Sequence, residues 1–189
     1  MTLLSPSVWL LCASALAVPA YAGQDKVNPD AQLQQDFKHR INEYMQLHKR
    51  LEKKAPPMKD KATPAEIKAS QEALAKAIRA ERATAKQGDI FSPEIARLFR
   101  RLMYPEVKGP EGADTKKAIK EDAPSPAAVT LKVNALYPEG APLPTVPPNL
   151  LASLPQLPED LEYRIVGKDL ILRDVHANVI VDFIANAIR

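Results

Sequence analysis

The pattern of apolar and polar positions divides the chain into a helical N-terminal half and a C-terminal half of short strands. Asn28 can cap a first helix that runs to about Lys54, and Pro29 fits its first turn, where no backbone donor is needed. Pro56 and Pro57 then end it. Apolar or half-apolar side chains recur along it every three or four residues, the spacing of one helix face: Leu33, Phe37, Ile41, Tyr44, His48 and Leu51.

Three further helices are predicted from their start signals. Thr63 and Glu66 have the spacing of a capping box, and the helix that follows is expected to end at Gly88 in a left-handed conformation. A shorter helix begins at Ser92 with a proline in its first turn. A fourth, weaker helix covers residues 113–121.

Residues 123–158 contain half of the 18 prolines of the chain. Because proline can neither donate to a β-ladder nor continue a helix, this segment is predicted to be an extended connector on the surface. Within it, residues 129–133 alternate like a strand, and residues 149–153 can form one helical turn.

The last 30 residues predict a three-stranded antiparallel meander. A two-residue turn at residues 167–168 begins with glycine, as a type II′ turn requires, and a second turn near residues 175–178 leads into a third strand at 179–184. In this register Glu162 faces Arg173. The opposite face carries four apolar side chains: Tyr163, Ile165, Leu170 and Leu172. Three strands alone bury too little surface, so we expect the meander to pack against a helix.

These elements predict an α+β fold with an N-terminal helical hairpin or bundle, a proline-rich extended connector and a small C-terminal antiparallel β-meander. The expected boundaries are a helical region over residues 23–122, the connector over 123–158 and the meander over 159–189, preceded by a separate segment at residues 1–22.

Residues 1–22 have the pattern of a cleavable secretory signal peptide, although they lack the usual early lysine or arginine. The apolar run from Val8 to Val18 is shorter than the roughly 20 residues that span a bilayer. Small residues at Ala20 and Ala22 predict cleavage after Ala22. We therefore expect a periplasmic or secreted protein with no transmembrane segment after cleavage, and an uncleaved N-terminal anchor is the alternative.

Composition narrows the function further. Cys12 is the only cysteine and would leave with the signal peptide, so no disulfide and no thiol chemistry are expected in the mature chain. The sequence shows neither a G-x-S-x-G elbow nor a glycine-rich phosphate loop. We therefore predict no catalytic residue and no cofactor, and we do not expect an enzyme.

The net charge of +3 comes from an excess of basic residues in the N-terminal half. In an exported protein, such a bias indicates contact with anionic envelope surfaces rather than with nucleic acid. The densest basic face consists of Arg97, Arg100 and Arg101, which are candidates for contact with an anionic surface. The alternative is that they are the solvated side of an amphipathic helix.

Two pairs on the first predicted helix have a spacing that can offer two ligands to one ion: His39 with Glu43, and His48 with Glu52. No third ligand is identifiable beside either pair. The simpler interpretation is that His48 belongs to the apolar stripe and that the glutamates make solvated helix pairs.

Three polar residues cluster near the second turn of the meander: Asp174, His176 and Asp182. They could bind a cation or form an acid–base site, but the preference of Asp and Asn for turns explains them better. Asp182 lies in an apolar run and is expected to point outward or to protect a sheet edge. The sequence thus assigns no metal site and leaves six weak candidate ligands: His39, Glu43, His48, Glu52, Asp174 and His176.

The C-terminal tail resembles a recurrent bacterial periplasmic pattern: Tyr163-Arg164-Ile165-Val166-Gly167, then Leu170-Ile171-Leu172, Asp174 and Val179-Ile180-Val181-Asp182. It is similar to the C-terminal module of the nickel and cobalt homeostasis protein RcnB, and the whole layout resembles a family of bacterial exported proteins. The resemblance implies an envelope location and a small β tail. It does not carry metal handling over, because no motif residue is a clear ligand.

We therefore expect a non-enzymatic exported protein that acts in envelope interaction or structure, with another envelope protein or an anionic envelope polymer as its partner. A periplasmic metal-homeostasis protein is the alternative. A hydrolase or isomerase whose site the sequence does not reveal is a third hypothesis.

Overall fold

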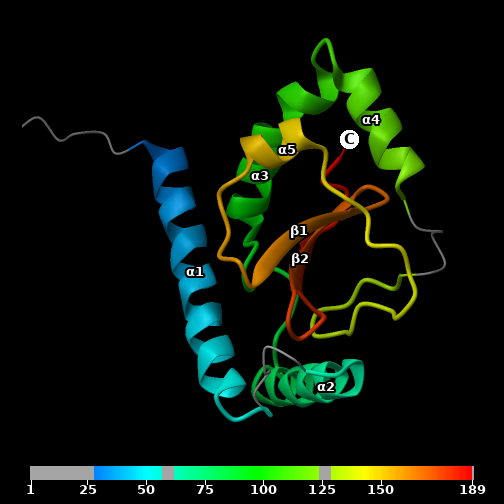
Figure 1. The fold of residues 1–189 in the computed structure, drawn as a ribbon. Coiled ribbons are helices and arrows are strands. Elements are labelled where there is room, and N and C mark those ends of the chain that lie inside the picture. Colours follow the sequence, from blue (N-terminus) through cyan, green and yellow to red (C-terminus); the bar gives the residue numbers. More distant parts are fainter. Residues whose placement is uncertain (1–27, 57–61, 124–128, 189) are drawn as a thin grey trace, which may run out of the picture.

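The computed structural model describes residues 28–56, 62–123 and 129–188. The expected signal peptide, its cleavage site at Ala22 and Cys12 lie outside these residues. Helices in the N-terminal half are followed by a C-terminal antiparallel sheet (Figure 1), which confirms the predicted α+β fold. The elements are α1 (Pro29–Glu52), α2 (Pro64–Glu81), α3 (Pro93–Lys108), α4 (Gly112–Glu121), α5 (Pro148–Ser153), β1 (Leu161–Val166), β2 (Asp169–Asp174) and β3 (Val179–Ile184).

The first three helices start at the predicted caps. The side chains of Asn28 and Ser92 each accept a backbone N–H of the first turn, and Thr63 and Glu66 form both bonds of the capping box. The predicted end of α2 is wrong, because the helix stops at Glu81, well before Gly88. Gly88 does adopt a positive φ of 95°, but in the loop that follows the helix. No helix in the described ranges is long and apolar enough to cross a membrane.

The sheet has the order β1-β2-β3 and the predicted register between its first two strands. Tyr163 pairs with Leu172, and Ile165 pairs with Leu170. Gly167 opens the turn with a φ of 63°, a conformation that glycine adopts without steric cost. The alternation of apolar positions and one glycine therefore specified this hairpin correctly.

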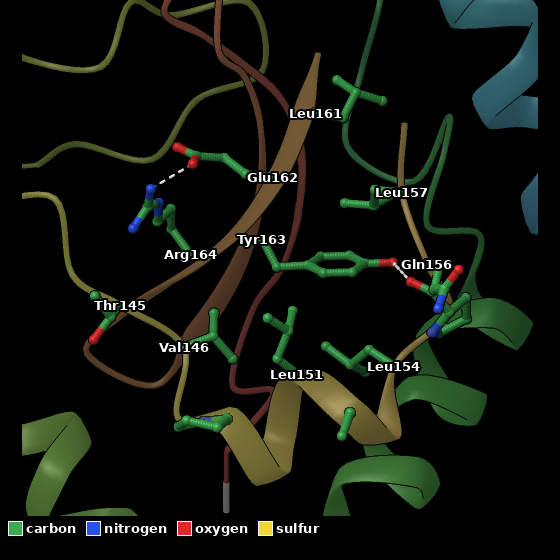
Figure 2. A pocket seen from close by; sticks show the side chains of 13 residues that line it. Thr145, Val146, Leu151, Leu154, Gln156, Leu157, Leu161, Glu162, Tyr163 and Arg164 are labelled. Atoms are coloured by element: carbon green, nitrogen blue, oxygen red, sulfur yellow. Dashed lines mark hydrogen bonds and ion pairs between the residues drawn. The ribbon is translucent and has the colours of Figure 1, made fainter. Parts of the chain in front are cut away.

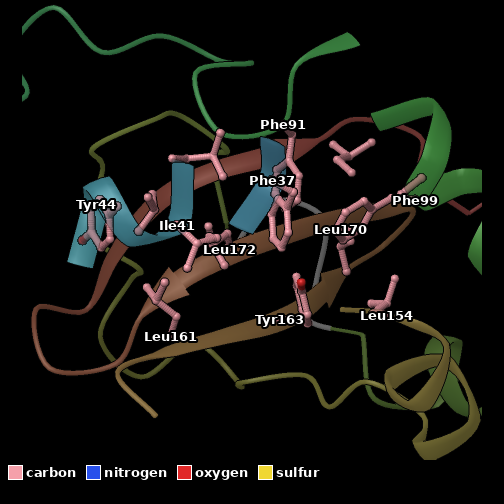
Figure 3. Packing of buried hydrophobic residues seen from close by; sticks show 14 of the residues in the cluster. Phe37, Ile41, Tyr44, Phe91, Phe99, Leu154, Leu161, Tyr163, Leu170 and Leu172 are labelled. Atoms are coloured by element: carbon pink, nitrogen blue, oxygen red, sulfur yellow. The ribbon is translucent and has the colours of Figure 1, made fainter. Parts of the chain in front are cut away.

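One face of the sheet packs against the helices, as predicted (Figure 3). Phe99 is central to this core, with ring centroids 4.9 Å from Phe37, 5.1 Å from Phe91 and 6.0 Å from Tyr163. These rings join α1, α3 and β1 with the loop before α3. The apolar stripe of the first helix is thus buried against the sheet rather than against a second helix alone.

The connector covers the opposite face of the sheet. A smaller core cluster combines connector and strand residues: Val129, Tyr137, Val166, Ile171 and Ile180. The strand predicted at residues 129–133 is wrong, because these residues have no strand partner and use their apolar side chains as a cover. The helical turn predicted at residues 149–153 forms as α5.

Asp182 does not point outward, so the expected solvent or edge position is wrong. It is fully buried, and its carboxylate accepts the backbone N–H groups of Gly88, Ile90 and Phe91 at 2.8 to 3.2 Å. The reason is a bulge: the register between β2 and β3 shifts beside Leu172. A bulge changes which face later residues occupy, and this one turns Asp182 toward the helices.

We predict that Asp182→Asn destabilises the protein by about 2–3 kcal/mol. The amide has no negative charge to strengthen the hydrogen bonds, and its NH2 group would face the N–H groups of the loop, which also donate. The measurement is urea unfolding followed by circular dichroism. Glu159→Gln is the matched control, since Glu159 is exposed and should leave the unfolding free energy nearly unchanged. Equal stability of the two variants would contradict a structural role for the Asp182 carboxylate.

Candidate metal centre

A buried carboxylate, Asp174, joins α1 to the end of β2. Its Oδ2 atom lies 2.6 Å from Nδ1 of His48 and accepts the hydroxyl of Tyr44 at 2.6 Å. Its Oδ1 atom accepts the backbone N–H of Ala177 at 2.7 Å. The side chains of His48 and Asp174 are both 0 % exposed. Because the carboxylate accepts from Nδ1, a neutral His48 keeps its proton there and presents a lone pair on Nε2.

The electrostatics of this network favour a protonated His48 and a protonated Tyr44, so an ion that binds Nε2 of His48 must displace its proton. Burial by itself lowers the pKa of His48, but the hydrogen bond and charge of Asp174, with the charges of Asp160 and Glu52, leave that pKa raised. Burial is also the largest cause that raises the pKa of Tyr44, and Asp174 adds to it. The Tyr44 hydroxyl therefore stays protonated and remains a donor to Asp174.

The other ring nitrogen of His48 faces donors from different parts of the chain. Nε2 has no hydrogen-bond partner among the described residues and lies 3.8 Å from Oε2 of Glu52. Three residues, His48, Asp160 and His176, each offer one donor atom, and these three atoms lie within 4.8 Å of one another. Nδ1 of His176 lies 3.1 Å from Oε1 of Glu52 and 3.6 Å from Oδ1 of Asp160. Two imidazoles and the carboxylate of Asp160 thus form one cluster, and the carboxylate of Glu52 lies beside the two imidazoles.

Three segments bring these donors together. The last turns of α1 supply His48 and Glu52, whose spacing of four residues puts them on one helix face. The carbonyl oxygen of Asp160 accepts the N–H of Val175 at 2.9 Å, which holds the residues before β1 beside the β2–β3 turn. His176 follows Val175 in that turn. The hairpin register therefore places Asp160 next to His176.

The donor set suits a divalent transition metal. Imidazole nitrogens with carboxylate oxygens are ligands of zinc, nickel, cobalt and copper. A tetrahedral zinc ion lies about 2.0–2.1 Å from each ligand atom, which puts neighbouring ligand atoms roughly 3.3 Å apart. The donor atoms here are up to 4.8 Å apart, so they must move closer together to bind an ion. The side chains of His176 and Asp160 are 36 % and 23 % exposed and can move inward. Asp174 has the position of the carboxylate that orients a metal-bound histidine.

A small cavity of about 170 Å³ lies beside the cluster. Glu52 and His176 form one part of its wall, and Ser70, Gln71 and Pro56 form another. His176 and Glu52 are 36 % and 44 % exposed, so an ion from solvent would reach these two side chains first.

The structure separates the six candidate ligands named from the sequence. His48 and His176 meet in the cluster, and Glu52 lies beside them. Asp174 holds His48 rather than facing the centre. His39 and Glu43 lie 3.6 Å apart on the exposed side of α1, with side chains 71 % and 63 % exposed. They form an ordinary solvated helix pair without a third donor in the described ranges.

Sequence reasoning missed Asp160. It lies in a loop, where no periodicity marks it, and it is far from the other donors along the chain. The hairpin register nevertheless indicated its position. Leu161 pairs with Asp174, so Asp160, the residue before Leu161, must lie beside the turn that follows Asp174.

The basic face of α3 is engaged with its own chain. Arg97 pairs with Glu94 at 2.8 Å, and Arg101 pairs with Asp30 at 2.5 Å. Arg100 donates to the backbone carbonyl of Ala185 at 2.8 Å. The ion pairs of Arg97 and Arg101 offset part of the positive charge of the face, and its contact with an anionic surface stays a prediction.

Compared with known proteins, the chain matches no family model, no curated protein and no solved structure. The similarity of the C-terminal tail to RcnB therefore stays a prediction, and the geometry of the cluster has to support any function by itself.

We predict that Asp174→Asn destabilises the fold by about 2–4 kcal/mol, because His48 and Tyr44 lose a buried acceptor with charge. Tyr44→Phe removes a single hydrogen bond, so its expected cost is about 1 kcal/mol. Urea unfolding measures both values. Nitrogen-15 NMR of the imidazole adds a direct readout: the preference of His48 for a proton on Nδ1 should weaken in Asp174→Asn. An unchanged tautomer would contradict the orienting role of Asp174.

Proposed function

We propose that this chain is a non-enzymatic protein that binds a divalent transition-metal ion through His48, Asp160 and His176, with Glu52 as a fourth donor. The observation that supports the proposal most strongly is the fully buried Nε2 of His48, which lacks a hydrogen-bond partner in the described chain. A buried polar atom without a partner costs about 1–3 kcal/mol. A metal ion would remove that cost by accepting the Nε2 lone pair.

The arrangement favours reversible binding. Asp174 fixes the ring of His48 before the ion arrives, whereas His176 and Glu52 are partly exposed and can close over it. Donors that must move inward lower the affinity relative to a preformed structural zinc site. We therefore expect dissociation constants in the micromolar range. This matches the metal-homeostasis alternative and the export expected from residues 1–22.

Binding is favoured over turnover by the size of the adjacent space. The cavity beside the cluster measures about 170 Å³, below the roughly 300–1,000 Å³ of pockets that enclose small-molecule substrates. It can admit a hydrated ion or a small anion. The proposal therefore keeps the expectation of a non-enzymatic protein and gives it a ligand.

Calorimetric titration of the chain from Gly23 onward with Zn²⁺, Ni²⁺, Co²⁺ and Cu²⁺ tests the proposal. We expect one site per chain, and we expect His176→Ala and Asp160→Asn each to weaken binding by at least about tenfold. His39→Ala is the matched control: it removes a histidine from the same helix that carries His48, but outside the cluster, and should leave the affinity unchanged. Visible absorption of the Co²⁺ complex reports the coordination geometry.

Two results would contradict the metal site. The first is a dissociation constant above about 100 μM for all four ions, since three donors that already lie close together should bind at least one of them more tightly. The second is an equal loss of affinity in His39→Ala and His176→Ala, which would mean that ions bind to exposed histidines without a defined centre.

A further inference from the structure

A groove of about 580 Å³ lies between α1 and the segment that joins α5 to β1 (Figure 1). This volume is within the roughly 300–1,000 Å³ of pockets that hold small molecules. The α1 wall extends from Ala31 to Asn42, which is about 16 Å at the rise of an α-helix. Residues 155–158 form the opposite wall. The groove is therefore elongated and suits a linear ligand.

Carboxamide side chains make up most of the polar lining of this groove. Gln34, Gln35 and Asn42 lie on the α1 wall, and Gln156 lies on the other. All four residues are exposed, and their side chains make no hydrogen bond to the part of the chain that the structure describes. A carboxamide offers two donors on its nitrogen and an acceptor on its oxygen. The groove thus presents donors and acceptors on both walls that the fold itself does not use.

The groove continues past Gln156. Residues 155–157 also line a neighbouring pocket of about 730 Å³ beside β1. Figure 2 shows Gln156 and Leu157 at the side of that pocket that lies across from Thr145. A chain-like ligand that fills the groove therefore has room to extend over Gln156 into a second hollow.

The lining of the groove carries little charge. Lys38 is the only charged side chain among the described residues that line it. A ligand with several negative charges would meet a single cation here, and each unpaired charge that becomes buried is costly. The basic face of α3 is the candidate for an anionic ligand, whereas the groove favours a ligand that is polar and mostly uncharged.

The groove also lacks the anchors of a protein interface, which are large aromatic, apolar or arginine side chains at its centre. Phe37 and Ile41 line the groove but are only 2 % and 3 % exposed. The large apolar residues that are exposed in the described chain all lie outside it: Ile67, Tyr104, Leu136, Leu143 and Leu151. A protein segment would thus find few contacts for its side chains.

We propose that this groove binds a linear, neutral glycan. Every sugar hydroxyl donates one hydrogen bond and accepts others, and this matches the donors and the acceptor of each carboxamide. Pro155, Leu157 and Pro158 are half-buried and give the C–H faces of sugar rings an apolar surface to pack on. This inference is independent of the metal site, and it assigns a chemical class of partner to the interaction role expected from the sequence.

The expected affinity is modest. Each hydrogen bond between the glycan and a carboxamide replaces one with water, so its net gain is small. Phe37 is the only aromatic residue among the described residues of the groove, and its burial leaves no ring for a sugar to stack on. We therefore expect a dissociation constant of about 0.1–1 mM for a tetrasaccharide.

NMR titration of the nitrogen-15-labelled chain from Gly23 onward tests the proposal. Cellotetraose, maltotetraose and chitotetraose are the probes, because they differ in linkage and in N-acetyl groups but are all neutral. At least one of them should shift the side-chain NH2 signals of Gln34, Asn42 and Gln156. The matching monosaccharide should bind at least about tenfold more weakly, because it reaches only part of the groove and forms fewer hydrogen bonds.

Two variants connect the binding to the groove. Asn42→Ala combined with Gln156→Ala removes one carboxamide from each wall and should weaken binding of the tetrasaccharide at least about tenfold. Gln32→Ala is the matched control, because Gln32 is an exposed glutamine of α1 outside the groove, and it should bind as the parent chain does. An equal loss in the control and in the double variant would overturn the proposal.

Three further results would also overturn it. The first is the absence of shifts with every tetrasaccharide at about 10 mM, well above the expected dissociation constant. The second is a set of shifts in the groove that appears only with dextran sulfate, which would identify an anionic polymer as the ligand. The third is a set of shifts that appears only with a pool of random octapeptides, which would identify a protein segment.

Discussion

The hydrogen-bonded carboxylate of Asp174 is the interaction on which the arrangement of this molecule depends. It accepts bonds from Tyr44 and His48 of α1 and from the backbone of the turn after β2. Burying a carboxylate is costly unless donors surround it, and here three donors do so. The same bonds that stabilise the carboxylate also set the rotation of α1 against the sheet. Nε2 of His48 faces Asp160 and His176 as a consequence.

A second buried carboxylate stabilises the part of the core next to the loop before α3. Asp182 has no lysine or arginine bonded to it among the described residues, and its charge is balanced by backbone N–H groups of that loop. Arg82, just after α2, contacts three other parts of the chain. Its guanidinium lies 5.2 Å from the ring centroid of Tyr44 in α1. It also donates to the side chain of Asn134 in the connector and to the carbonyl of Val181 in β3. The helices are thus attached to the sheet by polar bonds as well as by apolar packing.

The sequence by itself determined the helix starts, the hairpin register and the turn at Gly167, because capping, alternation and turn conformation depend on neighbours along the chain. It also placed His48, Glu52 and His176 among the candidate ligands. Tertiary structure decided the rest. The bulge that buries Asp182 and the use of residues 129–133 as a cover follow from packing between distant segments. The bond between His48 and Asp174 joins residues 126 positions apart, and only the docking of α1 on the sheet turns a helix pair and a turn histidine into one cluster.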